Sequence, residues 1–123
     1  MGRGGTMTVT RVIPNLRVDD LDAARRFYVD SLGMVEEPLG LEWITRFLDD
    51  STGTALQVFT HDATAHENPA ATVKVTDVDA TYATMQAAGY EIVHPLVTEE
   101  WGVRRFFVRP PGGAVLNIAQ DHD

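Results

Sequence analysis

Apolar residues recur at helical spacing in two stretches of the chain. Three or four positions separate successive members, so each series falls on one side of a helix. The two series are Leu21, Ala24, Phe27 or Tyr28, and Leu32, and then Val78, Tyr82, Met85 and Ala88. The pattern predicts two amphipathic helices, each with one apolar stripe.

Polar residues just before each apolar series predict where the helices begin. Asp19 and Thr76 carry side-chain oxygens that can cap the first helical turn. Asp22 and Asp79 then stand at the third helical position, where they would complete an acidic variant of the capping box.

Alternating and β-branched segments account for most of the remaining chain and predict strands. We expect strands at about residues 9–18, 42–49, 54–60, 70–76, 90–94, 101–109 and 114–120. Residues 51–53 and 110–113 have the composition of hairpin turns. The predicted fold class is therefore α+β.

The sequence contains an internal repeat. Residues 17–23, with the sequence RVDDLDA, match residues 74–80, with the sequence KVTDVDA, at an offset of 57 positions, as from residue 20 to residue 77. With one residue of slip Gly33 falls on Gly89, and both glycines are expected to end their helices because glycine accepts the left-handed conformation. The repeat predicts two modules that each contain a strand, a helix and further strands.

The 123 residues, 44% of them hydrophobic, suffice for one ordinary core. We expect a single domain over residues 9–121, with a first module at about 9–60, a polar crossover at 61–69 and a second module at about 70–121. Residues 1–8 are expected to form a flexible tail, in which Met7 can serve as the natural start and residues 1–6 as an extension.

Each predicted strand divides into two faces, because side chains alternate across a strand. Leu16 and Val18 share one face of the first strand, which we expect to lie under a helix. The other faces combine polar residues with aromatic ones and predict a concave small-molecule pocket; they carry Asn15, Arg17, Gln57, Lys74 and Asn117 beside Trp43, Phe47, Phe59 and Phe107. Alternatively, the same polar residues face water on the open side of an antiparallel sheet.

Charge and composition narrow the classes of partner. Ten basic and 18 acidic residues give a formal charge of −8, which argues against binding to nucleic acid or to an anionic membrane surface. A cationic small molecule would be attracted, although surplus surface acid on a soluble domain gives the same charge. No apolar run reaches the roughly 18 residues that span a bilayer, and no signal peptide is visible. The absence of cysteine fits a reducing compartment, so we expect the cytoplasm.

Several motifs together resemble one known family. They are LRVDDLD at residues 16–22, FY at 27–28, LGM at 32–34 and WGVRRFFV at 101–108. The chain is similar over about residues 10–120 to the vicinal oxygen chelate superfamily, which includes glyoxalase I, extradiol dioxygenases, fosfomycin-resistance enzymes and bleomycin-resistance proteins. The resemblance implies two tandem βαβββ modules that form a curved mixed sheet around a cup, with the helices on the outer face, in a homodimer.

The resemblance also locates the positions that hold a metal ion in the metal-using members. The two histidine positions correspond to Ile13 and Ala70, whose aliphatic side chains cannot bind an ion. The two carboxylate positions correspond to Gln57 and Asn117, whose neutral amides are weaker ligands. We therefore expect no metal ion and no other cofactor.

Other candidate groups give weaker signals. His61, His66, His94 and His122 show no ligand spacing, although two of them with Asp62 or Glu67 could form an adventitious metal site in the crossover, and His94 is the one best placed to reach the cup rim. The sequence Glu99, Glu100, Trp101 could hold a cationic or planar ligand by charge and stacking, or could be a charged loop before a buried tryptophan.

The first hypothesis is a metal-independent binding protein of the bleomycin-resistance type, which sequesters an antibiotic or an aromatic or cationic metabolite. Catalytic residues are not identified; the predicted ligand-binding residues are Asn15, Trp43, Phe47, Gln57, Phe59, Trp101, Arg105, Phe107 and Asn117. The second hypothesis is a metal-dependent lyase, isomerase or dioxygenase-like enzyme of the same superfamily. The third is a dimeric interaction module with a vestigial cup.

Overall fold

The computed structural model describes residues 8–61 and 67–121, which form two compact units. The N-terminal module is the unit formed by residues 13–68, and the C-terminal module is formed by residues 69–121 together with residues 8–12. The flexible tail predicted at residues 1–8 lies outside the described residues except for Thr8, which is hydrogen-bonded to Thr76. The prediction of a site that includes Asp62 or His66 also lies outside them, as does His122.

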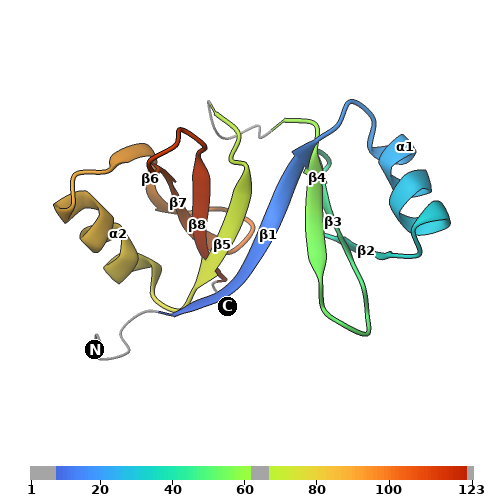
Figure 1. The fold of residues 1–123 in the computed structure, drawn as a ribbon, viewed down its shortest axis with the longest axis horizontal. Helices are drawn as coiled ribbons and strands as arrows, with labels where there is room; N and C mark the ends of the chain where they lie inside the picture. The colour runs from blue at the N-terminus through green and yellow to red at the C-terminus, as the bar shows by residue number, and fades with distance from the viewer. Residues whose placement is uncertain (1–7, 62–66, 122–123) are drawn as a thin grey trace. The chain divides into compact units, whose positions relative to one another are not determined.

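Each module contains one helical segment and a strand order of the βαβββ type, so the predicted α+β fold is confirmed. In the N-terminal module the elements are β1 (Val9–Arg17), α1 (Leu21–Arg25), η1 (Arg26–Ser31), β2 (Val35–Pro38), β3 (Ile44–Leu48) and β4 (Ala55–Phe59). In the C-terminal module they are β5 (Ala71–Val75), α2 (Val78–Ala87), β6 (Glu91–Thr98), β7 (Val103–Arg109) and β8 (Leu116–Asp121) (Figure 1).

The N-terminal module is a four-stranded mixed sheet in the order β2-β3-β4-β1. Strand β1 pairs in parallel with β4 through its second half, and the other two pairs are antiparallel. Helix α1 and the π-helical segment η1 that continues it pack on one face of this sheet. Ala24, Phe47 and Val58 form the core there, with Tyr28 packed against them. Of the two aromatic residues in the predicted stripe, Tyr28 is therefore the core residue, while Phe27 is 56% exposed.

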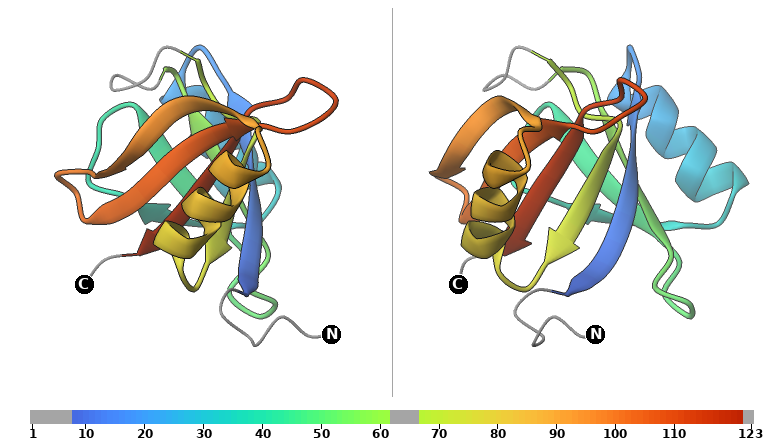
Figure 2. Two further views of the ribbon diagram at one scale, coloured as in Figure 1. Left: turned by 90° about the vertical axis from the view of Figure 1, so that its left-hand side faces the viewer. Right: turned by 60° about the vertical axis from the view of Figure 1, so that its left-hand side comes forward.

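The C-terminal module repeats this arrangement with the order β5-β8-β7-β6 and a parallel β5/β8 pair. Helix α2 lies across one face of the sheet (Figure 2). The core under this helix consists of Val75, Val78, Phe106, Val108 and Ile118. The first half of β1 also belongs to this module, because Thr8 and Thr76 exchange hydrogen bonds.

The helix starts correct the predicted caps by one residue. The Asp20 carboxylate accepts hydrogen bonds from the backbone N–H groups of Asp22 and Ala23, at 2.9 and 3.3 Å. Asp77 does the same for Ala80 at 3.0 Å. Asp19 and Thr76 were the wrong choices because a cap must directly precede the first helical residue, and both helices begin one residue later than expected.

The predicted capping boxes are also wrong. The Asp22 carboxylate accepts a hydrogen bond from Arg25 at 2.7 Å, and the Asp79 carboxylate accepts one from Arg104 at 2.8 Å. These two carboxylates therefore form salt bridges within their modules, whereas the capping box would have them accept a hydrogen bond from the backbone N–H of the N-cap residue. The predicted helix ends are confirmed, since Gly33 has φ of 82° and takes the left-handed conformation directly after the helix.

Strand β2 was missed from the sequence, and the structure explains its position. Glu36 of this strand accepts hydrogen bonds from Arg25 of α1 at 2.9 Å and from Thr45 of β3 at 2.7 Å. Burial raises the pKa of Glu36, but the hydrogen bonds from Thr45 and Arg25 outweigh it and lower that pKa below the usual value of 4.5. The ionised carboxylate thus connects the short strand to the helix above it.

Replacing Glu36 is expected to remove a pH-dependent part of the stability. Because the folded-state pKa is lowered, the carboxylate stabilises the fold above its ordinary pKa, and this contribution is lost as the pH falls below that value. We expect Glu36→Gln to reduce the free energy of unfolding by about 1–2 kcal/mol at pH 7. Denaturant titrations from pH 7 to pH 3 should show the difference shrinking. Glu100→Gln, at an exposed position, serves as the control.

Candidate functional site

The face of the N-terminal sheet opposite α1 carries a row of polar residues across all four strands. Glu37 pairs in register with Arg46, Arg46 with Gln57, and Gln57 with Asn15. Residues in register point to the same side of a sheet, so these four side chains are neighbours. We call them the N-terminal row.

Hydrogen bonds connect the N-terminal row from end to end. Arg46 donates from Nη1 to Glu37 at 3.1 Å and from Nε and Nη2 to the Gln57 amide oxygen at 3.0 and 2.8 Å. The Gln57 amide nitrogen donates to the Asn15 side-chain oxygen at 2.8 Å. Gln57 is buried and the Arg46 side chain is only 13% exposed, so this is a shielded, charge-assisted network.

The C-terminal sheet carries the corresponding row on its face opposite α2. Thr72 pairs with Asn117, Asn117 with Phe107, and Phe107 with His94. The offset of 57 positions found in the sequence relates residue 15 to residue 72, and the other three residues lie on the strands that correspond to β4, β3 and β2. These four residues, the C-terminal row, are therefore the structural counterparts of the N-terminal row.

The C-terminal row leaves one polar atom without a hydrogen bond. The Asn117 amide nitrogen donates to the Thr72 hydroxyl at 3.1 Å. The Asn117 side-chain oxygen is buried, and within residues 8–61 and 67–121 nothing donates to it. A buried acceptor left unpaired costs about 1–3 kcal/mol.

Arg105, on the next position of the same face of β7, organises the groups beside the C-terminal row. Its guanidinium lies 4.9 Å from the centre of the Phe107 ring and 5.2 Å from that of Trp101. Glu99 accepts a hydrogen bond from Arg105 at 2.7 Å, and both side chains are at least 88% buried. The His94 ring packs on Phe107 with centroids 4.9 Å apart. Arg105 is thus surrounded by aromatic rings, and its charge is paired with that of Glu99.

The structure brings several predicted residues together within each module. Asn15 and Gln57 are in direct contact, and Phe59 follows two positions later on the same strand face. Trp101, Arg105, Phe107 and Asn117 gather around the C-terminal row. Trp43 directly precedes β3, where its carbonyl accepts a hydrogen bond from Thr60.

The prediction that Phe47 shares this face is wrong. Phe47 follows Arg46 on β3, so alternation turns it to the helix side, where it stacks on Tyr28 at a centroid distance of 5.1 Å and has no exposed surface. It had been grouped with the other aromatics by residue type. The same alternation could have identified Arg46, which the sequence reasoning missed, and Glu37 was missed because β2 was not predicted.

The acidic loop before β7 also differs from the expectation of two carboxylates available to a ligand. Glu99 is already paired with Arg105, and its carboxylate lies 3.7 Å from the His94 ring nitrogen. Only Glu100 of the pair is exposed.

His61 contacts the neighbouring Thr60 hydroxyl at 3.2 Å. In the part of the chain that the structure describes, no three His, Cys, Asp or Glu residues are grouped so as to hold a metal ion.

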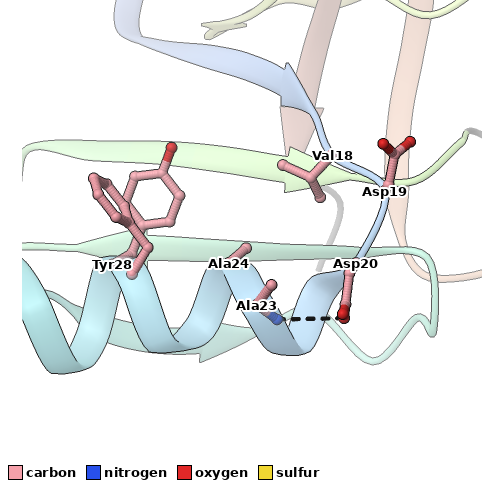
Figure 3. A pocket seen from close by; sticks show the side chains of 7 residues that line it. Val18, Asp19, Asp20, Ala23, Ala24 and Tyr28 are labelled. Atoms are coloured by element: carbon pink, nitrogen blue, oxygen red, sulfur yellow. Dashed lines mark hydrogen bonds between the residues drawn. The ribbon is translucent and has the colours of Figure 1, made fainter.

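An open pocket of about 540 Å³ lies elsewhere, at the start of α1 on the helix side of the N-terminal module (Figure 3). Its two carboxylates are engaged, because Asp20 caps the helix and Asp19 pairs with Arg17 at 3.0 Å. It contains none of the predicted ligand-binding residues; its lining is Val18, Asp19, Asp20, Ala23, Ala24, Phe27 and Tyr28.

The paired βαβββ modules, each with a polar or aromatic row opposite its helix, define an α+β domain of a known class. The model of the Glyoxalase/Bleomycin resistance protein/Dioxygenase superfamily matches residues 8–118. The chain therefore belongs to this superfamily. No curated protein sequence matches it. Among its described residues no helix is long and apolar enough to cross a membrane.

Solved structures share the fold. A superfamily member from Vibrio splendidus 12B01 is 22% identical, with 93% of this chain and 100% of that chain covered and a TM-score of 0.66. A protein described as NAD-dependent benzaldehyde dehydrogenase from Legionella pneumophila is 17% identical, with coverages of 90% and 99% and a TM-score of 0.69. The Mn(II)-bound glyoxalase from Novosphingobium aromaticivorans is 24% identical, with coverages of 94% and 40% and a TM-score of 0.64. Identities this low show the fold alone.

The residues at the four expected ligand positions do not fit a metal ion. Ile13 is fully buried hydrocarbon, and Ala70 offers only a methyl group. The Gln57 oxygen already accepts two hydrogen bonds from the Arg46 guanidinium. Asn117 alone has a lone pair available, on a neutral amide. One weak ligand falls short of the three or more that a protein metal site requires.

Phe47 is expected to support the fold. Because its ring is fully buried against Tyr28, Phe47→Ala should lower the free energy of unfolding by about 3–5 kcal/mol. The matched variant Phe27→Ala removes the same ring from an exposed position and should cost less than about 1 kcal/mol. Urea denaturation of both variants measures the difference, and equal losses would contradict the assignment of Phe47 to the core.

Proposed function

We propose that this protein binds a small organic molecule without a metal ion. The single observation that carries the proposal is the Arg46 guanidinium, which donates to the Gln57 oxygen at 2.8 and 3.0 Å. At a separation of about 4 Å and an effective dielectric constant of about 20, it would repel a cation by about 4 kcal/mol for each unit of the ion's charge. The nearby Glu37 carboxylate reduces this repulsion, but it is bonded to Arg46 and does not change the hydrogen bonds at the Gln57 oxygen.

The composition of the faces opposite the helices supports an organic ligand. The aromatic residues proposed to pack against the ligand are Trp43, Phe59, Trp101 and Phe107. The polar residues proposed to orient it by hydrogen bonds are Asn15, Gln57, Arg105 and Asn117. Aromatic walls with a few polar groups are typical of small-molecule sites. Glu99 neutralises Arg105 and the whole chain carries −8, so the overall charge disfavours an anionic ligand.

Three finer points belong to the same proposal. Sequestration of an antibiotic or an aromatic metabolite would follow the bleomycin-resistance members of the superfamily. The family resemblance supports a homodimer, and the absence of cysteine supports a cytoplasmic location. We also retain residues 9–121 as one domain, with the repeat as its support.

Metal analysis tests the proposal first. Purified protein incubated with Mn²⁺, Zn²⁺ or Ni²⁺ and then dialysed should retain far less than one ion per chain by elemental analysis, because only one of the four expected ligand positions has an available lone pair. His61→Ala controls for adventitious binding by surface imidazole. One retained ion per chain would instead favour the alternative, a metal-dependent lyase, isomerase or dioxygenase-like enzyme.

Ligand titration tests the organic site. Planar aromatic compounds, with bleomycin among them, should quench tryptophan fluorescence saturably at one site per chain, and a chelator should not change the affinity. Trp43→Phe leaves Trp101 as the sole reporter, and Trp101→Phe leaves Trp43. Loss of binding on chelation, or turnover of a compound by substoichiometric protein, would refute a metal-independent binding protein.

A further inference from the structure

The two rows occupy equivalent positions but differ in how their polar groups are satisfied. In the N-terminal row the oxygens of Glu37, Gln57 and Asn15 each accept a hydrogen bond from within the row. In the C-terminal row Phe107 takes the position of Arg46. A phenyl ring donates no conventional hydrogen bond, so the amide next to it on β8 has lost the donor that its counterpart has on β4.

The Asn117 amide is held in one orientation by its other end. Its nitrogen donates to the Thr72 hydroxyl at 3.1 Å on the neighbouring strand β5. Its oxygen is therefore directed away from Thr72. With 8% of the residue exposed, water has little access to this oxygen, and a hydrogen bond made there would be stronger than one in bulk solvent.

The neighbours of Asn117 define what could satisfy it. Phe107 pairs in register with Asn117, and its ring contacts the Arg105 guanidinium and the His94 ring. A ligand in this place must be planar enough to pack on aromatic groups and must bring a donor to the amide oxygen. Since the oxygen exposes almost no surface, such a ligand reaches it only with a local movement of side chains.

We propose that the buried Asn117 oxygen is the specificity determinant of the site, and that it selects planar aromatic ligands with an N–H or O–H donor. This inference rests on the proposed binding function and adds the ligand class. It assigns the preference for a donor to the C-terminal row, because the Gln57 and Asn15 oxygens of the N-terminal row already accept hydrogen bonds.

Matched probe pairs test the inference. Phenol and anisole, indole and N-methylindole, and benzamide and N,N-dimethylbenzamide differ in each pair by loss of the donor. We expect the donor member to bind at least about fivefold more tightly, because it satisfies a buried acceptor. Affinities come from NMR titration of isotopically labelled protein, in which donor probes should also shift the Asn117 side-chain amide resonance.

Variants of the amide separate recognition from folding. Asn117→Leu has a similar shape without the acceptor, so the affinity ratio within each pair should fall to about one. Its melting temperature should stay within about 3 °C of the parent protein, because an unpaired buried oxygen is removed. Thr72→Val releases the amide and should reduce the ratio partially. Gln86→Leu makes the same type of change on the exposed side of α2 and should leave the ratio unchanged.

The outcomes distinguish the two proposals. If both members of each pair bind equally well without metal, the binding function holds and the role of Asn117 is wrong. If the donor preference persists in Asn117→Leu, another acceptor is responsible and the inference fails. If no probe binds at millimolar concentration, both proposals are overturned.

Discussion

Alternation of side chains along in-register strands is the constraint on which each module of this protein depends. One face of each sheet packs against a helix, and the core residues there are hydrocarbon: Phe47 and Val58 in the N-terminal module, Phe106 and Val108 in the C-terminal module. The opposite face is then free to differ between the modules, because the core under the helix supports the fold. That separation lets one repeat carry a polar network and the other an aromatic cluster at equivalent positions.

The contrast between the rows is chemical rather than architectural. Arg46 supplies the N-terminal row with a fixed positive charge that is partly balanced by Glu37 and shared with the Gln57 amide. In the C-terminal row the equivalent strand position is Phe107, and the cation Arg105 lies two residues away, where Glu99 neutralises it. The two equivalent amides therefore differ in their surroundings: Gln57 lies beside the Arg46 guanidinium, and Asn117 lies beside the Phe107 ring.

Much of the fold follows from local sequence signals. The repeat, the apolar stripes and Gly33 correctly predicted two modules that each contain a strand, a helix and further strands, because helical periodicity and glycine conformation are properties of short segments. The start of each helix was misplaced by one residue, since Asp19 and Asp20 are chemically equal candidates and only the backbone conformation distinguishes them. Strand β2 was missed because two adjacent glutamates break the alternation expected of a half-buried strand.

The candidate site was predictable only where alternation was applied. It placed Asn15 and Gln57 on the same mixed face, and the structure brings the two side chains into contact at 2.8 Å. Alternation along β3 also separates Phe47 from Arg46, whereas residue type alone groups Phe47 with the other aromatic residues. The unpaired oxygen of Asn117 could not be read from the sequence, because it depends on which neighbour donates, and Thr72 and Phe107 become neighbours only through strands distant in the chain.

The division of β1 has a consequence for how this chain can be taken apart. Residues 15–17 pair with β4, whereas Thr8 and Thr10 form hydrogen bonds with Thr76 and Lys74 at the end of β5. The two modules therefore cannot be separated by cutting the chain at the boundary of the sequence repeat. A fragment cut within the crossover would deprive the C-terminal half of its edge partner, and autonomous folding of that half requires the first residues of β1 to be grafted back.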